Sequence, residues 1–221
     1  MLKNRILSVL TAFILSSFAA ESAQAEVFYW KDPEFKIDFV FPHEWRIQHD
    51  KNTDVRIRVL APQGQDYASC KISAKRDGRY AMYPDRYVQR VNSVVFDVKG
   101  LMQYWIEHDN VRMIHRSDYA SIGKSHAVYA EARYTRNFGI RNLPMRGMVL
   151  ATLYGDMNLV FDCEAAERNW NYWVPEFMSM ARTVNFPLNQ RSTPNGWYRR
   201  FQEDGEIYMS TDNARTGTIT Y

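Results

Sequence analysis

The sequence has little net charge and few long apolar runs. Its 28 Lys and Arg residues against 25 Asp and Glu residues leave a net charge of +3, and this nearly neutral balance gives no ground for a nucleic-acid partner, which should show a concentrated basic face. After residue 25 no segment approaches the ~20 continuous apolar residues that span a bilayer. Any membrane contact of the mature chain is therefore expected to be peripheral at most.

The sequence also lacks a motif that would assign a reaction. Gly123-Lys124-Ser125 invites comparison with a phosphate-binding loop, but that motif needs a glycine where this chain has Asp118. There is no Gly-x-Ser-x-Gly, and the histidine spacing matches no His-Glu-x-x-His or similar metal signature. We therefore expect no catalytic residues, no metal and no cofactor, and we interpret the chain as not an enzyme.

Cysteine is scarce, because the 221 residues contain only Cys70 and Cys163. Each lies on the apolar face of a segment whose side chains alternate with period two, as in a half-buried strand. Neither belongs to a Cys-x-x-Cys pair, so a redox or nucleophilic thiol is the less favoured alternative. An even pair in an exported protein favours a structural disulfide.

The expectation of export comes from the first 25 residues. Lys3 and Arg5 form a short basic start, residues 6–20 are mostly apolar, and Ala23-Gln24-Ala25 supplies the small residues of a cleavage site. No cysteine follows the apolar run, which argues against a lipid-modified N-terminus. The sequence therefore predicts a cleavable signal peptide at 1–25 and a periplasmic or secreted mature chain that begins near Glu26.

The following 162 residues, 26–187, show the periods of strands and of two helices. Residues 36–41, 55–60 and 68–75 alternate between apolar and polar side chains and predict an antiparallel meander with one dry face. Apolar residues at helical spacing predict a core-facing helix over 87–105, which Gly100 could divide, and a second helix around 170–184. Between the helices, further strands are predicted over 111–119, 125–135, 145–154 and 158–164. The fold class is therefore α+β, a mostly antiparallel sheet flanked by helices.

The remaining residues, 188–221, are predicted to form a linker followed by an aromatic, hairpin-like tail. Asp204-Gly205 separates two strand-like runs, which is a hairpin signal. The tail mixes aromatic and arginine side chains, the types that dominate binding hot spots. It docks either on its own domain or on a partner. The candidate partner-binding residues are Trp197, Tyr198, Arg199, Arg200, Phe201 and Tyr208.

One stretch resembles a known family. Phe39-Val40-Phe41-Pro42-His43-Glu44-Trp45 is a strand that ends in Phe-Pro with Trp three residues later, and Thr183-Val184-Asn185-Phe186 stands where the family shows Ser-Phe-x-Phe. With the element order, these segments resemble the PsbP/Mog1-type α/β/α sandwich, including its small exported bacterial members, over residues 35–187. The resemblance implies an adaptor or assembly factor rather than an enzyme.

These observations predict a non-catalytic envelope protein that binds another exported protein, with the tail contributing to contact. An alternative is a small-ligand or lipid-binding module with a pocket between sheet and helices, lined by Trp105, Trp170 and Trp173. A hydrolase with a dispersed active site is the third hypothesis.

Overall fold

The computed structural model describes residues 26–62, 66–78 and 87–187. The expected signal peptide at 1–25 and the expected linker and tail at 188–221 lie outside the described residues. Among the residues that are described, no helix is long and apolar enough to cross a membrane.

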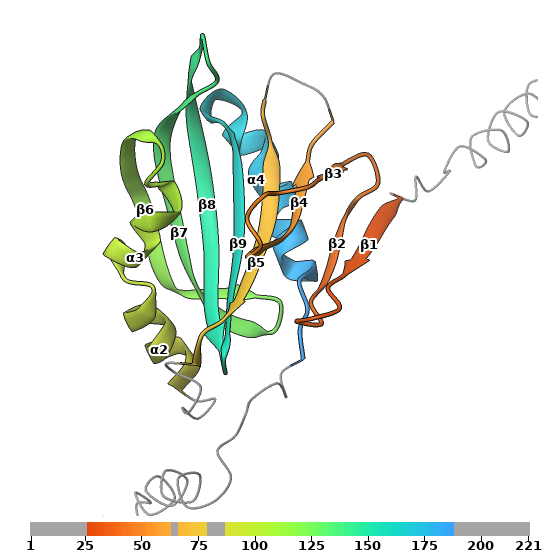
Figure 1. Ribbon diagram of the computed structural model, residues 1–221. Coiled ribbons are helices and arrows are strands. Elements are labelled where there is room, and N and C mark those ends of the chain that lie inside the picture. Colours follow the sequence, from red (N-terminus) through yellow and green to blue (C-terminus); the bar gives the residue numbers. More distant parts are fainter. Residues whose placement is uncertain (1–25, 63–65, 79–86, 188–221) are drawn as a thin grey trace, which may run out of the picture.

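A seven-stranded antiparallel sheet forms the centre of the domain (Figure 1). Its order across the sheet is β3-β4-β5-β9-β8-β7-β6, so it consists of two meanders joined where β5 pairs with β9. The predicted α+β class and the strands of the second meander are confirmed. The strands are β3 (Arg46–Gln48), β4 (Val55–Leu60), β5 (Ser69–Arg76), β6 (Asp109–Ile122), β7 (Ser125–Asn137), β8 (Asn142–Tyr154) and β9 (Met157–Ala166).

The first predicted meander is wrong in one respect. Residues 38–42 form β2 (Asp38–Pro42), but β2 pairs with β1 (Val27–Lys31) in a separate two-stranded sheet rather than with β4. The edge place beside β4 belongs to the short β3. On its other side, β2 contacts the residues that follow the last helix of the domain. The amide of Asp38 donates to the carbonyl of Asn185 at 2.7 Å.

The predicted helix over 87–105 is divided, and the break is not at Gly100. It consists of α2 (Val88–Val95), α3 (Val98–Met102) and the 3-10 turn η4 (Gln103–Trp105). Asp97 begins α3, since its carboxylate accepts from the amide of Gly100 at 2.7 Å, as an N-cap does. Val94 and Val98 are exposed, with exposed fractions of 64% and 54%, so they are not core residues as the helical periodicity predicted.

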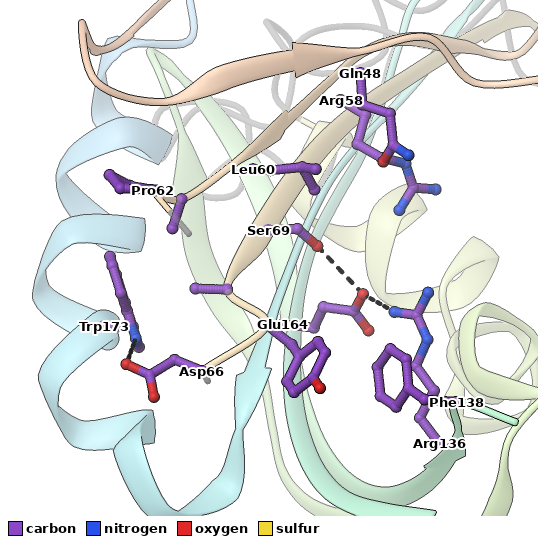
Figure 2. A pocket seen from close by; sticks show the side chains of 13 residues that line it. Gln48, Arg58, Leu60, Pro62, Asp66, Ser69, Arg136, Phe138, Glu164 and Trp173 are labelled. Carbon is purple, nitrogen blue, oxygen red and sulfur yellow. Dashed lines mark hydrogen bonds and ion pairs between the residues drawn. The ribbon is translucent and has the colours of Figure 1, made fainter. Parts of the chain in front are cut away.

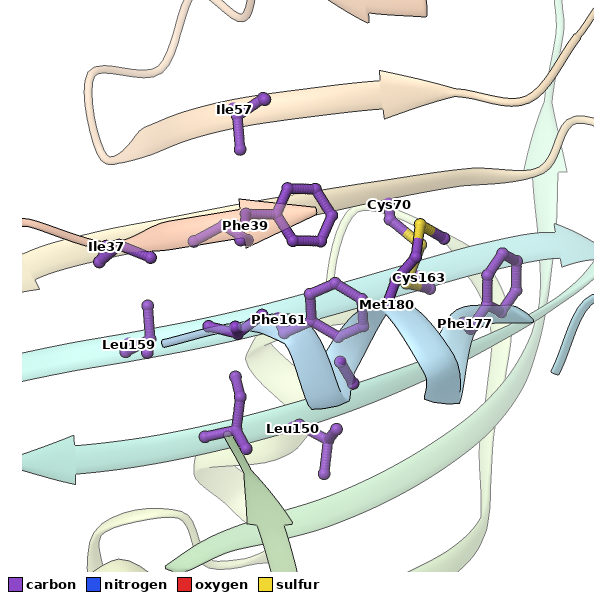
Figure 3. Close-up of a cluster of buried hydrophobic side chains, with 14 of the residues drawn as sticks. Ile37, Phe39, Ile57, Cys70, Leu150, Leu159, Phe161, Cys163, Phe177 and Met180 are labelled. Carbon is purple, nitrogen blue, oxygen red and sulfur yellow. A yellow bond between two sulfur atoms is a disulfide. The ribbon is translucent and has the colours of Figure 1, made fainter. Parts of the chain in front are cut away.

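The helices cover opposite faces of the sheet. The α2–η4 segment packs over β6, β7 and β8 around a core that includes Leu101, Trp105 and Val149. The helix α4 (Trp170–Thr183), preceded by the turn η5 (Glu167–Asn169), covers the other face together with β1 and β2, where Phe39, Phe161 and Phe177 are buried (Figure 3). β8 is apolar on both faces and is buried almost throughout, as predicted.

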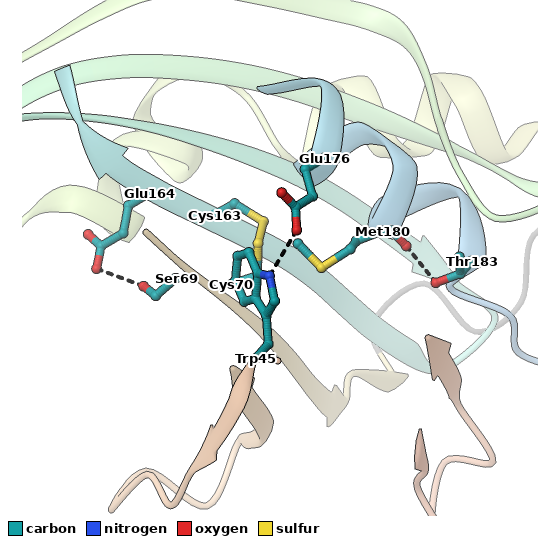
Figure 4. Close-up of a disulfide and its surroundings, with 8 residues drawn as sticks. All are labelled: Trp45, Ser69, Cys70, Cys163, Glu164, Glu176, Met180 and Thr183. Carbon is teal, nitrogen blue, oxygen red and sulfur yellow. Dashed lines mark hydrogen bonds between the residues drawn. A yellow bond between two sulfur atoms is a disulfide. The ribbon is translucent and has the colours of Figure 1, made fainter. Parts of the chain in front are cut away.

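Trp45 of the Phe-Pro-x-x-Trp segment belongs to this second core. Its side chain is buried and lies edge-on to Trp173 at 5.7 Å between ring centroids, and its indole nitrogen donates to Glu176 at 2.8 Å (Figure 4). The residue that marks the resemblance therefore fastens the chain between β2 and β3 to α4.

A disulfide joins Cys70 of β5 to Cys163 of β9, and no free cysteine is present among the described residues. The two residues are directly opposite each other in the antiparallel register. Both sulfur atoms lie in the α4-side core, beside Met180 (Figure 4). This is the pairing that the two apolar strand faces predicted, and its burial gives it the role of a structural bond.

Candidate functional site: a groove on the open half of the sheet

One half of one sheet face is left open by the described helices. The α2–η4 segment covers this face over β6, β7 and β8 but leaves it free over β3, β4 and β5. Strand alternation places polar side chains there, because the apolar ones face α4. Gln48, Arg58, Lys71 and Asp162 follow one another across β3, β4, β5 and β9.

Fixed ion pairs organise this row. The Lys71 ammonium lies 2.9 Å from Asp162, and the attraction of that carboxylate raises the pKa of Lys71. The Arg58 guanidinium binds Asp50 through Nε at 2.8 Å and Nη2 at 2.5 Å. Arg58 and Lys71 are cross-strand neighbours of like charge, and such neighbours repel each other. Asp50 beside Arg58 and Asp162 beside Lys71 offset this repulsion.

A second polar group is centred on Glu164, which lies two residues after Asp162 on β9. Its carboxylate accepts from Tyr134 Oη at 2.6 Å and from Ser69 Oγ at 3.2 Å, and it pairs with Arg136. Burial by itself would raise the pKa of Glu164, but Arg136 and the Tyr134 hydroxyl outweigh it and hold that pKa below its usual range. The Glu164 carboxylate is therefore ionised, and it is bound by Tyr134, Ser69 and Arg136.

One aromatic contact, between His108 and Tyr134, extends this group. The His108 ring stacks on Tyr134 with 4.5 Å between centroids and 11° between planes, and burial lowers the pKa of His108. Gly147, opposite Glu164, makes room for the packing, since a Cβ there would lie 3.0 Å from Trp105 Nε1 and 3.1 Å from Tyr134 Oη.

A cleft of about 200 Å³ lies at the end of the sheet beside Glu164 (Figure 2). We call it the aromatic cleft; its walls include Leu60, Pro62, Tyr67, Phe138 and Trp173 together with Arg58, Arg136 and Glu164. Tyr67 and Phe138 approach to 4.4 Å between centroids, and Arg136 lies over the Phe138 ring at 5.0 Å. Asp66 ties the β4–β5 connection to α4 by accepting from Asn169 and from Trp173 Nε1.

A second cleft of about 520 Å³ continues along the sheet between β4, β5 and η4. This charged cleft is lined by Asp50, Lys71, Tyr104, Ile106 and Glu107 among others, and Arg58 lines both clefts. Tyr104 is mostly buried, which raises the pKa of its hydroxyl. We call the two clefts together the sheet groove.

The three tryptophans predicted to line one pocket are not brought together. Trp105 is buried in the core on the α2–η4 face, whereas Trp170 and Trp173 lie on α4, on the opposite face. The prediction of a shared pocket is corrected for a simple reason: β8 is apolar on both sides, so the two helices cover different faces. Trp173 does line the aromatic cleft.

Other predicted residues fall outside the groove or outside the described chain. The tail residues Trp197, Tyr198, Arg199, Arg200, Phe201 and Tyr208 lie outside the described residues. Arg56 of β4 also lies outside the groove that Arg58 and Lys71 line, because it binds Asp32 at 2.6 Å.

Sequence reasoning missed Glu164 and Arg136 as parts of a site. The available signal was the alternation of Asp162 and Glu164 along an otherwise apolar strand, which marks a polar patch on a face expected to be covered. No group of three or more His, Cys, Asp or Glu side chains that could hold a metal ion is found within the described ranges.

Comparison with known proteins finds likeness at the level of fold. No protein-family model matches the chain, and no curated protein matches it. Solved structures similar to it include cyanobacterial PsbP from Synechocystis, with a TM-score of 0.47, 13% identity, and coverage of 76% of this chain and 97% of that one.

Two further structures cover similar shares of the chain. LpqN of Mycobacterium tuberculosis, described as involved in cell envelope biogenesis, gives a TM-score of 0.44 and 11% identity over 73% of this chain and 91% of that one. The Ran-binding protein Mog1p of Saccharomyces cerevisiae gives 0.43 and 6% over 74% and 96%. The likeness to these structures concerns the fold alone.

Proposed function

We propose that this chain is an exported, non-catalytic binding protein that recognises a segment of another envelope protein in the sheet groove. The observation that supports the proposal best is the combination of fixed, paired charges with aromatic side chains in two clefts that share Arg58. Aromatic and arginine side chains in a desolvated setting are the residue types that dominate binding energy at protein interfaces.

The electrostatics favour recognition over proton transfer. A general base works best when its pKa lies near the operating pH, and the pKa of Glu164 is shifted the other way, downward. Ser69 does touch this carboxylate at 3.2 Å, but a carboxylate that is held ionised by Arg136 accepts a proton poorly. Groups held in fixed pairs instead give a pattern of donors and acceptors that a partner can match at little entropic cost.

The shape of the groove favours an extended partner segment. Arg58 lines both the cleft of about 200 Å³ and the cleft of about 520 Å³, so one ligand chain that passes Arg58 can contact both. The Tyr67 side chain, 43% exposed, and the Ile106 side chain, 65% exposed, offer apolar contacts in the aromatic and the charged cleft respectively. The tail residues 197–208 provide further contact in this proposal.

The test is site-specific photocrosslinking in the envelope of the producing cell. A photoreactive residue replaces Tyr67 or Ile106 in two variants, and Tyr119, which is 86% exposed on the edge strand β6, in a matched control. We expect the same adduct from both groove positions and none from position 119. Adducts from all three positions, or from none, would overturn the proposal.

A companion variant separates the groove from the tail. Deletion of residues 188–221 should weaken the adduct if the tail contributes to binding. An undiminished adduct would confine the binding site to the groove and remove the tail from the proposal.

A small-ligand module is the second candidate, favoured by the charged cleft itself. Its volume of about 520 Å³ is within the range of small-molecule pockets, and it lies between sheet and helix as such pockets do. A ligand-induced rise in melting temperature that Tyr104→Phe removes, in the absence of any crosslinked partner, would favour this candidate.

A further inference from the structure

A basic surface lies on the other side of the molecule, at the end of the β1–β2 sheet. Lys31, Lys36 and Lys124 line one cavity of about 380 Å³ with Asp38 and Asn185. The three lysines come from β1, from the turn before β2 and from the β6–β7 hairpin. All three are exposed, so segments far apart in the sequence bring their charges to one place.

The single carboxylate in this cavity is already occupied. Asp38 accepts from Tyr29 Oη at 2.6 Å and from Asn185 Nδ2 at 3.3 Å, and Lys31 lies 3.8 Å from it. Three lysines against one aspartate leave a local charge of +2. The cavity therefore presents a positive potential toward solvent.

Exposed apolar side chains stand next to these lysines on β1. Val27 and Tyr29, which lie on the same face of β1 as Lys31, have exposed fractions of 60% and 58%, and β1 is the outermost strand of its pair, on the side of the molecule away from α2 and α3 (Figure 1). At ~3.3 Å per residue, the strand places Val27 about 13 Å from Lys31. Apolar and aromatic side chains beside lysines are the composition of a surface that rests in the headgroup region of a bilayer.

From this juxtaposition we infer that the surface formed by Val27, Tyr29, Lys31, Lys36 and Lys124 binds the face of an anionic lipid bilayer. Charge complementarity selects the bilayer: the lysines meet anionic headgroups, and the β1 side chains enter the boundary between headgroups and acyl chains. The surface lies at β1–β2 and the β6–β7 hairpin, and none of its residues lines either cleft of the sheet groove. A membrane-bound molecule would therefore keep its groove free, and this inference does not depend on the proposed function.

The test is co-sedimentation of the purified, exported chain, its N-terminus established by mass, with lipid vesicles. Vesicles of equal parts phosphatidylglycerol and phosphatidylcholine should bind it, vesicles of phosphatidylcholine alone should not, and high salt should release it. The variant Lys31→Gln/Lys36→Asn/Lys124→Gln should bind on the order of a hundredfold more weakly, about fivefold for each lysine. Asparagine is chosen at position 36 because the backbone there has φ +54°, which asparagine tolerates.

Matched variants keep the experiment decisive. Lys99→Gln/Arg112→Gln/Arg141→Gln removes the same net charge at exposed positions elsewhere and should bind as the natural chain does. Val27→Ser should weaken binding a few-fold even at low salt, because it removes apolar contact. Equal loss in both triple variants would show a net-charge effect only. Binding of inorganic phosphate without binding of anionic vesicles would show a soluble-anion site. Either result would overturn the inference.

Discussion

Replacement of Glu164 by glutamine should show how much the groove depends on one charge. Glutamine keeps the shape of the side chain but removes the ion pair with Arg136 and weakens the bonds from Tyr134 and Ser69. Breaking a buried pair costs about 3–5 kcal/mol, and exposed pairs contribute far less. The Glu164 and Arg136 side chains are 12% and 33% exposed, so we expect a loss of about 2–3 kcal/mol in the free energy of unfolding at neutral pH.

The pH dependence of this loss is the sharper test. The pKa of Glu164 is lower in the folded chain than in the unfolded chain, so its contribution is fully present above the unfolded value, about 4.3. It disappears as the pH falls through the lower folded value. The difference between the natural chain and Glu164→Gln should therefore be constant near neutrality and shrink in acid.

Urea unfolding followed by near-ultraviolet circular dichroism, from neutral pH into the acidic range, measures this difference. Glu107→Gln, at an exposed position in the same groove, is the matched control and should change stability by less than about 0.5 kcal/mol. A Glu164→Gln loss that stays the same at every pH would refute the assignment of an ionised Glu164 as the centre of the network.

Three other substitutions test the fold that supports the groove. Cys70→Ala/Cys163→Ala opens a loop with a sequence separation of 93. It should cost up to about 4–5 kcal/mol in urea unfolding, and reduction of the natural chain should cause a similar loss; an unchanged midpoint would contradict this. Gly123→Ala places a Cβ 1.9 Å from the Val184 carbonyl oxygen at φ +54° and should cost more than about 2 kcal/mol by thermal unfolding. Gly139→Ala, also at positive φ but with no atom within 4 Å, should cost about 1 kcal/mol, and equal losses would exclude the steric cause. Asn92→Leu removes bonds to Thr152, to the His126 carbonyl and from the Leu153 amide and should cost about 2–4 kcal/mol. Hydrogen exchange at Leu153 should then accelerate, and unchanged protection would argue against a role for Asn92.

Much of the sheet could be predicted because period-two alternation is a direct result of pleating. The same alternation put Cys70 and Cys163 on apolar faces, and the register then set them opposite each other. The division of the first helix was harder to place. Gly100 was the expected break, but the capping carboxylate of Asp97 begins the new helix, and a cap is decided by a side-chain bond rather than by propensity.

The groove could not be predicted because it depends on which strands become neighbours. Lys71 and Asp162 are far apart in the sequence and meet across the pairing of β5 with β9. The same limit applies to β2, whose alternation fits either sheet. Trp105 and Trp173 were grouped by residue type, yet each follows its own helix to a different face.

The order of the strands has a consequence for how the sheet assembles. Every neighbouring pair among β3–β5 and among β6–β9 is consecutive in the chain, so each meander closes through short connections. The pairing of β5 with β9 alone joins the two, and it must wait until the chain up to residue 166 is available. Such non-local closure is entropically costly and slows folding. Cys70 and Cys163 face each other in the pairing of β5 with β9. Formation of their disulfide therefore indicates that the two meanders have paired in the correct register.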